Sequence, residues 1–409
     1  MNLKEINKIF NDTAYVRTGG SPDEKRAAEY IKSILKAKGL EAALEPFEVA
    51  MSDVHSATLT VCGKEISCKG YMLCGSGEIE APIYYLRSDD RLSLSNCRGK
   101  IVLFDGYMGY WRYRDIFENG AVGFISYDGN ANYADRDIDR RELRPYVSQG
   151  DKILGVNINA KDAIAIVKNG AGVAKISINQ TEYTAHSHNV VLEIPGEREE
   201  FITFTAHYDS TPLSKGAYDN MSGSIALIAL AEKFSKMKPG YSLRFIWCGS
   251  EERGLLGAKA HCAANKDELS KTVLNINIDM IGSIMGKFIA CCTTEEKLVN
   301  YISYMSDELG FQIKPYQEVY SSDSTPFADG GVPAVSFARS APANTATIHN
   351  SYDTKAVLSM EQMSLDIDFI AEFAKRMAMA KLCPVSREIP ENLKTKLDEY
   401  LCRKRKSAD

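Results

Sequence analysis

Five short segments in the second half of the chain place a histidine or a carboxylate directly after an apolar run. They are Ala206-His207-Tyr208-Asp209, Tyr218-Asp219-Asn220, Ser250-Glu251-Glu252, Ile278-Asp279-Met280 and Ile348-His349-Asn350. In an open α/β sheet, the crevice beyond the carboxyl ends of the strands is where ligands bind. One such side chain would mean little, but five in one half of the chain indicate a site.

The residue types suit zinc. Two histidines and three carboxylates suffice for a pair of zinc ions: His207, Asp219, Glu252, Asp279 and His349. Zinc takes imidazole nitrogen and carboxylate oxygen, and two zinc ions ~3.5–4 Å apart need a bridging carboxylate and a few terminal ligands each. Glu251 is then left without a metal and is expected to be the general base that takes a proton from zinc-activated water.

Each of these residues also has a plain structural interpretation. Glu251 and Glu252 could be the acidic first turn of a helix, which the helix dipole favours. Asp209 could orient His207 from two residues away, or it could only begin the turn at Ser210. Ordinary hydrogen-bonded side chains are expected for the other histidines of the chain, which are His55, His186, His188 and His261.

The elements that must position these residues alternate between strand and helix from Asn189 onward. Strands are predicted at 201–205, 243–248, 273–278 and 334–337, and helices at 221–234, from 254, at 298–309 and at 360–382. An earlier helix opens at Pro22 and ends near Gly39, and a strand follows at 45–49. This order predicts an α/β fold with an open, mostly parallel mixed sheet and helices on both faces. Residues 57–185 differ, since they read as short β-rich segments that include strands at 99–104 and 120–125.

Bulk composition narrows the classes of partner. A net charge of −5 and a pI near 5.8 give no reason to expect nucleic acid. The basic run 403–406 is expected to be a solvated tail. The N-terminus has charges where a signal peptide needs an apolar stretch, and no window approaches the ~18 apolar residues of a membrane span. The ten cysteines show no Cys-x-x-Cys spacing, so reduced thiols and a cytoplasmic location are expected.

Taken in order, the motifs resemble a known family. The run His207-x-Asp209, 216–223 (Gly-Ala-Tyr-Asp-Asn-x-Ser-Gly), 251–257 (Glu-Glu-x-Gly-x-x-Gly), 278–280 (Ile-Asp-Met) and His349 is similar to the di-zinc exopeptidases that include aminopeptidase Y and aminopeptidase S. Glutamate carboxypeptidase and glutaminyl cyclase are more distant relatives of that fold. The resemblance covers residues 189–382 and the N-terminal helix.

The resemblance implies a role for each matching position. His207 and Asp279 would complete the first zinc, Glu252 and His349 the second, and Asp219 would bridge both. Glu251 would be the general base, and Asp209 would support His207. A cis peptide is also implied after the bridging aspartate, at Asp219-Asn220. The glycosylation pattern Asn220-Met221-Ser222 falls inside this metal turn, where a glycan could not be accommodated.

The resemblance also implies a domain organisation. Residues 1–56 and 186–385 would form the catalytic domain, and residues 57–185 are similar to the protease-associated domain inserted in this family. Every expected ligand follows that insert, which argues against sibling families whose first ligand histidine precedes it. Residues 386–409 are expected to be a helical tail, because Leu393, Leu397 and Leu401 recur at helical spacing after Pro390.

The expected activity is a metal-dependent aminopeptidase with two zinc ions per chain and a peptide substrate that has a free N-terminus. The alternatives are a carboxypeptidase or dipeptidase on the same site, a non-catalytic binding protein of this fold, and a glutaminyl cyclase. The family carries Ser-Asp-His at the position of 322–324, or a tyrosine near it, to stabilise the oxyanion. Here Ser324 is too short, so Tyr320 is expected to donate to the oxyanion, unless it only packs against its loop.

Overall fold

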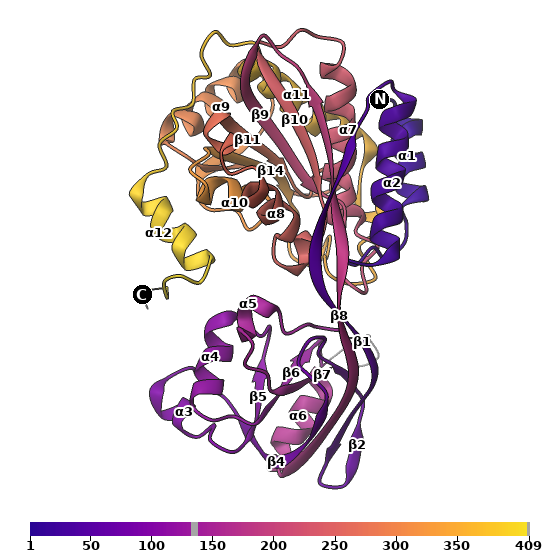
Figure 1. Ribbon diagram of the computed structural model, residues 1–409, viewed down its shortest axis with the longest axis vertical. Helices are drawn as coiled ribbons and strands as arrows, with labels where there is room; N and C mark the ends of the chain where they lie inside the picture. The colour runs from indigo at the N-terminus through magenta and orange to yellow at the C-terminus, as the bar shows by residue number, and fades with distance from the viewer. Residues whose placement is uncertain (132–137, 407–409) are drawn as a thin grey trace. The chain divides into compact units, whose positions relative to one another are not determined.

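The structure is a computed structural model that describes residues 1–131 and 138–406 (Figure 1). The chain divides into two compact units. Unit 1 comprises Met1–Val49 and His186–Asp409, and unit 2 comprises Ala50–Ala185. The expected insert, residues 57–185, lies within unit 2, and its identification as a protease-associated domain stays a prediction.

Unit 1 has an α/β fold, in which helices cover a β-sheet. Its helices are α1 (Leu3–Asp12), α2 (Pro22–Ala37), α7 (Ser222–Phe234), α8 (Leu256–Ala264), α9 (Glu296–Leu309), α10 (Ser324–Asp329), α11 (Met360–Ala378) and α12 (Glu391–Tyr400). Its strands are β9 (Arg198–His207), β10 (Tyr241–Cys248), β11 (Thr272–Ile278), β12 (Lys287–Thr293), β13 (Lys314–Gln317) and β14 (Ala334–Ser340). Two long strands connect it to unit 2, β1 (Ala43–Val61) and β8 (Val173–Ile194).

The strand order of unit 1 is β13-β12-β14-β11-β9-β10-β8. The four central strands, β14, β11, β9 and β10, are parallel, whereas β12 pairs antiparallel with β14 and β8 pairs antiparallel with β10. The edge strand β13 pairs parallel with β12. Every residue of β10 and β11 is buried, which is typical of strands covered on both faces. The predicted fold class, an open, mostly parallel mixed sheet, is confirmed.

Alternate side chains of β10 reach different cores. Phe245 stacks on Phe204 at a ring-centroid distance of 4.6 Å, in a core shared with α2, α7 and α11 (Figure 1). Ile246 packs instead in a separate cluster with Ala258 of α8 and Phe327 of α10. Because successive side chains of a strand point to opposite faces, helices cover both faces of this sheet.

The C-terminal helix expected from the sequence is α12. It follows Pro390 directly and buries Leu393 and Leu397 against Ala328 and Ala334 of unit 1. All ten cysteines are free thiols. No helix in the described part of the chain is both long and apolar enough to cross a membrane.

Unit 2 has its own sheet and core. Its strands β4 (Gly77–Tyr85), β5 (Ile101–Asp105), β6 (Gly123–Asp128) and β7 (Leu154–Asn159) run parallel, and β3 (Cys68–Gly70) pairs antiparallel with β7. The helices α3 (Arg91–Ser95), α4 (Tyr110–Glu118) and α5 (Pro145–Ser148) lie between these strands in the chain, α6 (Ala160–Lys168) follows β7, and β2 (Lys64–Ile66) pairs with β1. A continuous cluster of buried residues from β5 and β6 fills the interior.

Candidate metal centre

Three adjacent parallel strands bring most of the predicted ligands to one edge of the sheet. His207 is the last residue of β9, Asp279 follows β11, and Glu252 lies in the short turn η2 (Glu251–Arg253) after β10. Asp219 lies in η1 (Ala217–Met221), between β9 and α7. His349 comes from the loop between β14 and η4 (Lys355–Val357), with a left-handed backbone at φ 58°.

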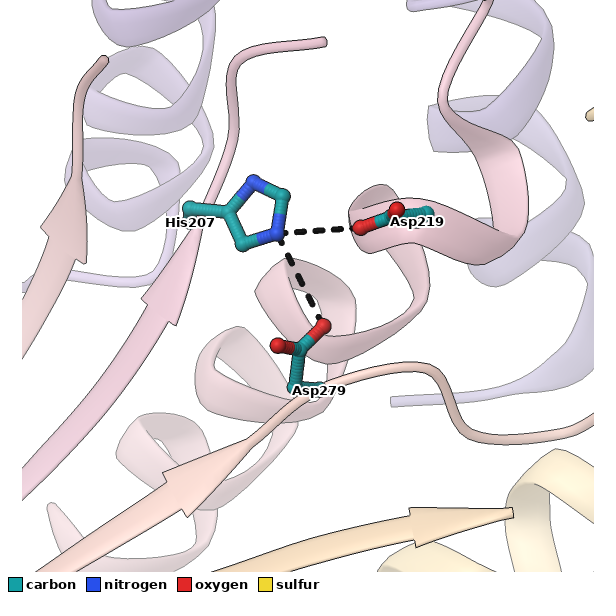
Figure 2. A group of neighbouring side chains, drawn as sticks. All are labelled: His207, Asp219 and Asp279. Carbon is teal, nitrogen blue, oxygen red and sulfur yellow. Dashed lines mark ion pairs between the residues drawn. The ribbon is translucent and has the colours of Figure 1, made fainter. Parts of the chain in front are cut away.

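The five side chains form two triplets that share Asp219. In the first, Nε2 of His207 lies 3.1 Å from Oδ1 of Asp219 and 3.6 Å from Oδ1 of Asp279 (Figure 2). In the second, Nε2 of His349 lies 3.2 Å from Oδ2 of Asp219 and 3.0 Å from Oε2 of Glu252. The ligand atoms of each triplet all lie within 4.8 Å of one another. Asp219 therefore presents one oxygen to each triplet.

One carboxylate oxygen of the first triplet lacks a hydrogen-bond partner among the described residues. Asp279 accepts a hydrogen bond from Ser322 through Oδ2, whereas its buried Oδ1 has no hydrogen-bond partner among the described residues. Buried polar atoms are nearly always satisfied, so an orphaned carboxylate oxygen that faces an imidazole needs an explanation. A metal ion between the two groups provides one.

The electrostatics of the cluster also favour cations. Burial, together with repulsion by Asp219, raises the pKa of Glu252 to about 7. Burial raises the pKa of Glu251 well above its usual value, and the neighbouring acids Glu252, Asp323 and Asp279 add to this although His207 opposes it. Divalent cations offset such repulsion, so the donor set fits zinc.

Asp209 contacts the Glu251-Glu252 turn more closely than it contacts His207. Its Oδ1 accepts the backbone N–H of Glu251 at 3.0 Å, and its Oδ2 accepts that of Glu252 at 3.3 Å. Oδ1 lies 3.5 Å from Nδ1 of His207. A single buried carboxylate thus links the loop after β9 to the loop after β10.

The loop that carries Asp219 is held by two buried residues that the sequence analysis did not single out. Asp353 accepts the backbone N–H of Tyr218 at 2.7 Å and that of Asp219 at 3.1 Å. Arg17 donates to five backbone carbonyls, which belong to Thr13, Tyr15, Tyr208, Lys215 and Gly216. No local pattern could have indicated their role at this loop, because the partners there lie more than a hundred residues away in the chain.

A third unexpected residue, Glu24 of α2, holds the start of the η2 turn. Its Oε1 accepts the backbone N–H of Ser250 at 2.7 Å and the hydroxyl of Ser187 at 2.8 Å. Ser250 has a left-handed backbone at φ 53°, which is uncommon for a residue other than glycine. Burial, together with the charge of Asp209, raises the pKa of Glu24 to about 8.

Tyr320 lies in the loop between β13 and α10, half-buried. Burial, followed by the nearby charges of Asp279 and Asp219, raises the pKa of its phenol well above the usual value. Ser324 instead pairs with Ser336 at 2.8 Å. Asp323 is fully buried beside the cluster, and burial raises its pKa to about 7.

The remaining expectations concern the turn at Asp219 and the other histidines. The Asp219-Asn220 peptide is cis, as the resemblance implied, and Asn220 is fully buried. His261 pairs with Glu45 at 2.8 Å, and His55 with Thr181 at 2.8 Å. Neither histidine belongs to a group of three or more potential metal ligands in the described ranges.

Known proteins that are similar to this chain include aminopeptidases. Aminopeptidase YwaD of Bacillus subtilis is 26% identical over 339 residues, which cover 78% of this chain and 71% of that protein. Leucine aminopeptidase 2 of Trichophyton equinum is 28% identical over 279 residues, 65% of this chain. The chain spans 55% of the length of this fungal relative.

Two solved structures share the fold over nearly the whole chain. An aminopeptidase from Aneurinibacillus sp. strain AM-1 has a TM-score of 0.77 and 23% identity, and the match covers 94% of this chain and 96% of that one. A zinc aminopeptidase from Bacillus subtilis has a TM-score of 0.76 and 22% identity, with 95% and 99% covered.

The sheet and the cluster at its carboxyl edge therefore define an α/β peptidase fold with a candidate metal centre. The similarity can be stated more closely: residues 189–374 match the model of peptidase family M28. The matched segment contains all five predicted ligands.

Proposed function

We propose that this protein is a zinc-dependent aminopeptidase that uses two metal ions to hydrolyse the N-terminal bond of peptides. The observation that carries the proposal is the pair of side-chain triplets that share Asp219. A carboxylate that offers one oxygen to each of two triplets is what a two-metal hydrolytic site requires.

The choice of aminopeptidase follows from the relatives. Both sequence relatives and both structural neighbours described above are named aminopeptidases, and one is named a zinc aminopeptidase. A carboxypeptidase or dipeptidase on the same site is the alternative, since the cluster alone does not select an end of the peptide. The free thiols favour a reducing compartment, such as the cytoplasm.

The residues divide into two ligand sets. His207 and Asp279 would hold the first zinc, Glu252 and His349 the second, and Asp219 both. Zinc bound there supplies Lewis acidity, which makes water acidic enough to lose a proton near neutral pH. Glu251 is in neither triplet, and its Oε2 lies 3.8 Å from Nε2 of His207. It is therefore placed to accept that proton.

Two further residues support the reaction. Asp209 orients the Glu251-Glu252 turn through two backbone N–H groups and faces Nδ1 of His207. Tyr320 keeps its phenolic proton at neutral pH and donates it in a hydrogen bond to the oxyanion that forms when the peptide carbonyl is attacked. The alternative is that Tyr320 only packs against its loop.

The test is hydrolysis of aminoacyl amides, free peptides, and peptides blocked at either end, before and after treatment with a chelator. Cleavage should require a free N-terminus, disappear on chelation and return when zinc is added. The zinc content should be about two ions per chain and should fall in His207→Ala and in His349→Ala.

Two results would count against the proposal. Cleavage of N-blocked peptides, together with loss of cleavage when the C-terminus is blocked, would establish the carboxypeptidase alternative. Retention of two zinc ions per chain in both histidine variants would show that the ligand assignment is wrong.

A further inference from the structure

The side chain of Asn220 clasps the peptide groups on either side of Asp279. Its Nδ2 donates to the carbonyl of Ile278 at 2.9 Å, and its Oδ1 accepts the backbone N–H of Met280 at 3.0 Å. Asn220 also follows Asp219 directly in the chain. One amide therefore connects the loops that carry two of the three side chains in Figure 2.

The clasp is buried and closely packed. Asn220 is fully buried, and its Oδ1 also accepts the N–H of Gly223, the second residue of α7, at 2.9 Å. A Cβ on Gly223 would lie 2.3 Å from the carbonyl oxygen of Ile278 and 2.5 Å from Oδ1 of Asn220. The glycine is thus required for the amide to reach its partners.

The clasp fixes Asp279 where β11 ends. Met280 has a left-handed backbone at φ 63°, so the chain turns sharply just after the carboxylate. The N–H of Asp279 is itself bonded to the carbonyl of Phe337 in β14 at 3.0 Å. The contacts with Asn220 tie the same turn to the loop of Asp219, together with a hydrogen bond from the N–H of Ile281 to Oγ of Ser222 at 3.1 Å.

We propose that Asn220 is a positioning residue that sets the separation of Asp219 and Asp279 and so determines the affinity of the first metal site. This inference rests on the two-zinc assignment proposed above. Both polar atoms of the Asn220 side chain bond to backbone groups, so it acts through the backbone on both sides of Asp279.

The second triplet provides an internal reference. Asp219 belongs to both triplets, but Glu252 and His349 lie on loops that Asn220 does not contact through any of the hydrogen bonds described here. Loss of the clasp should therefore weaken the first site more than the second.

The experiment compares Asn220→Leu with Asn275→Leu. Asn275 is a fully buried amide on β11, four residues before Asp279. It donates to the carbonyl of Thr203 and to the hydroxyl of Thr205. Zinc affinities are measured by competition with a chromophoric chelator. Asn220→Leu should lower the affinity of one of two sites by roughly 10–100-fold, and Asn275→Leu should leave both unchanged.

A second variant separates position from charge. Asn220→Asp keeps the acceptor for Met280 and Gly223 but loses the donor to Ile278, and it adds a negative charge near the cations. If charge alone mattered, zinc would bind more tightly, whereas a positioning role predicts weaker binding. Gly223→Ala, which displaces the amide without replacing it, should act in the same direction and serves if Asn220→Leu does not fold.

A readout without metal completes the test. In the zinc-free protein, amide hydrogen exchange at Met280 and Gly223 should accelerate in Asn220→Leu and not in Asn275→Leu. Equal zinc affinity in wild type and Asn220→Leu, with two ions bound in each, would overturn the inference alone. Failure of the wild type to bind zinc would instead overturn the proposed function, and the exchange at Met280 would still decide whether the clasp exists.

Discussion

Glu251 and Glu252 are adjacent in sequence, yet their carboxylates have different surroundings. Oε2 of Glu252 lies 3.0 Å from Nε2 of His349, within the second triplet, whereas Glu251 belongs to neither triplet. Glu251→Gln should keep two zinc ions and lower kcat by roughly 10²–10⁴-fold, because it removes only the proton acceptor. Glu252→Gln should lower zinc content first.

Zinc content and turnover, measured on the same preparations, distinguish these outcomes. Adding excess zinc should partly restore turnover in Glu252→Gln and should have no effect on Glu251→Gln. If both variants lose the same amount of zinc, the two roles cannot be separated as proposed.

Tyr320 offers a second prediction at the scale of single residues. Tyr320→Phe removes only the hydroxyl, so the loss of an oxyanion donor worth ~3 kcal/mol should appear in kcat with little change in KM. Tyr316→Phe on β13 is a matched control, because Tyr316 stands opposite Cys291 of β12 in the sheet. Wild-type turnover in Tyr320→Phe would leave Tyr320 with a packing role only.

The sequence was enough to predict which side chains form the candidate metal centre, but not which buried residues hold their loops in position. His207, Asp219 and Asp279 each follow an apolar run, and that local pattern is enough to place them at one edge of a sheet. Glu24 and Asp353 act on partners more than a hundred residues away, and nothing in their neighbours in sequence marks them. Their roles exist only once the loops are folded together.

At the scale of elements, prediction succeeded where a strand is central and failed at the sheet edge. The runs at 243–248 and 273–278 are mostly apolar and correspond to β10 and β11. The sequence analysis did not assign β12 or β13. β12 is a short apolar run, which periodicity alone does not distinguish from a buried helix segment, and β13 has no fully buried residue.

The packing of α2 against α7 provides a pH-dependent prediction. Lys38, which caps α2, lies 2.6 Å from Oε2 of Glu232 in α7. The hydrogen bond from Lys38 holds the pKa of Glu232 at about 2, below the usual 4.5. A depressed carboxylate pKa stabilises the fold above pH 4.5, and this contribution is lost as the pH falls toward 2.

Glu232→Gln should therefore lower the free energy of unfolding by about 1 kcal/mol at pH 7 and by progressively less below pH 4.5. Denaturant unfolding at a series of pH values measures the difference. In a Lys38→Met background, the same substitution should show a smaller dependence on pH. A difference that stays constant from pH 7 to pH 3 would show that the pair adds no charge-dependent stability.

At the scale of the whole molecule, unit 1 is assembled from two separate stretches of chain. Its N-terminal stretch supplies Arg17 and Glu24, which hold loops that begin after residue 207. The candidate centre therefore depends on residues from both sides of unit 2 in the sequence. Unit 2 contributes none of the side chains in either triplet.

We expect unit 2 to fold when it is expressed without the rest of the chain, because it has a core of its own. Ile101, Val102, Leu103 and Phe104 of β5 are all buried within a cluster drawn only from this unit, and β5 is paired on both sides by parallel strands. A chain of this length buries enough apolar surface to support one core.

Residues 50–185 expressed alone should unfold cooperatively in denaturant, with a near-ultraviolet circular dichroism signal from the packed rings of Tyr71, Tyr113 and Phe124. Phe124→Ala should lower the free energy of unfolding of this fragment by roughly 3–5 kcal/mol, because the ring is fully buried. A fragment without a cooperative transition would mean that its core forms only when the rest of the chain is present.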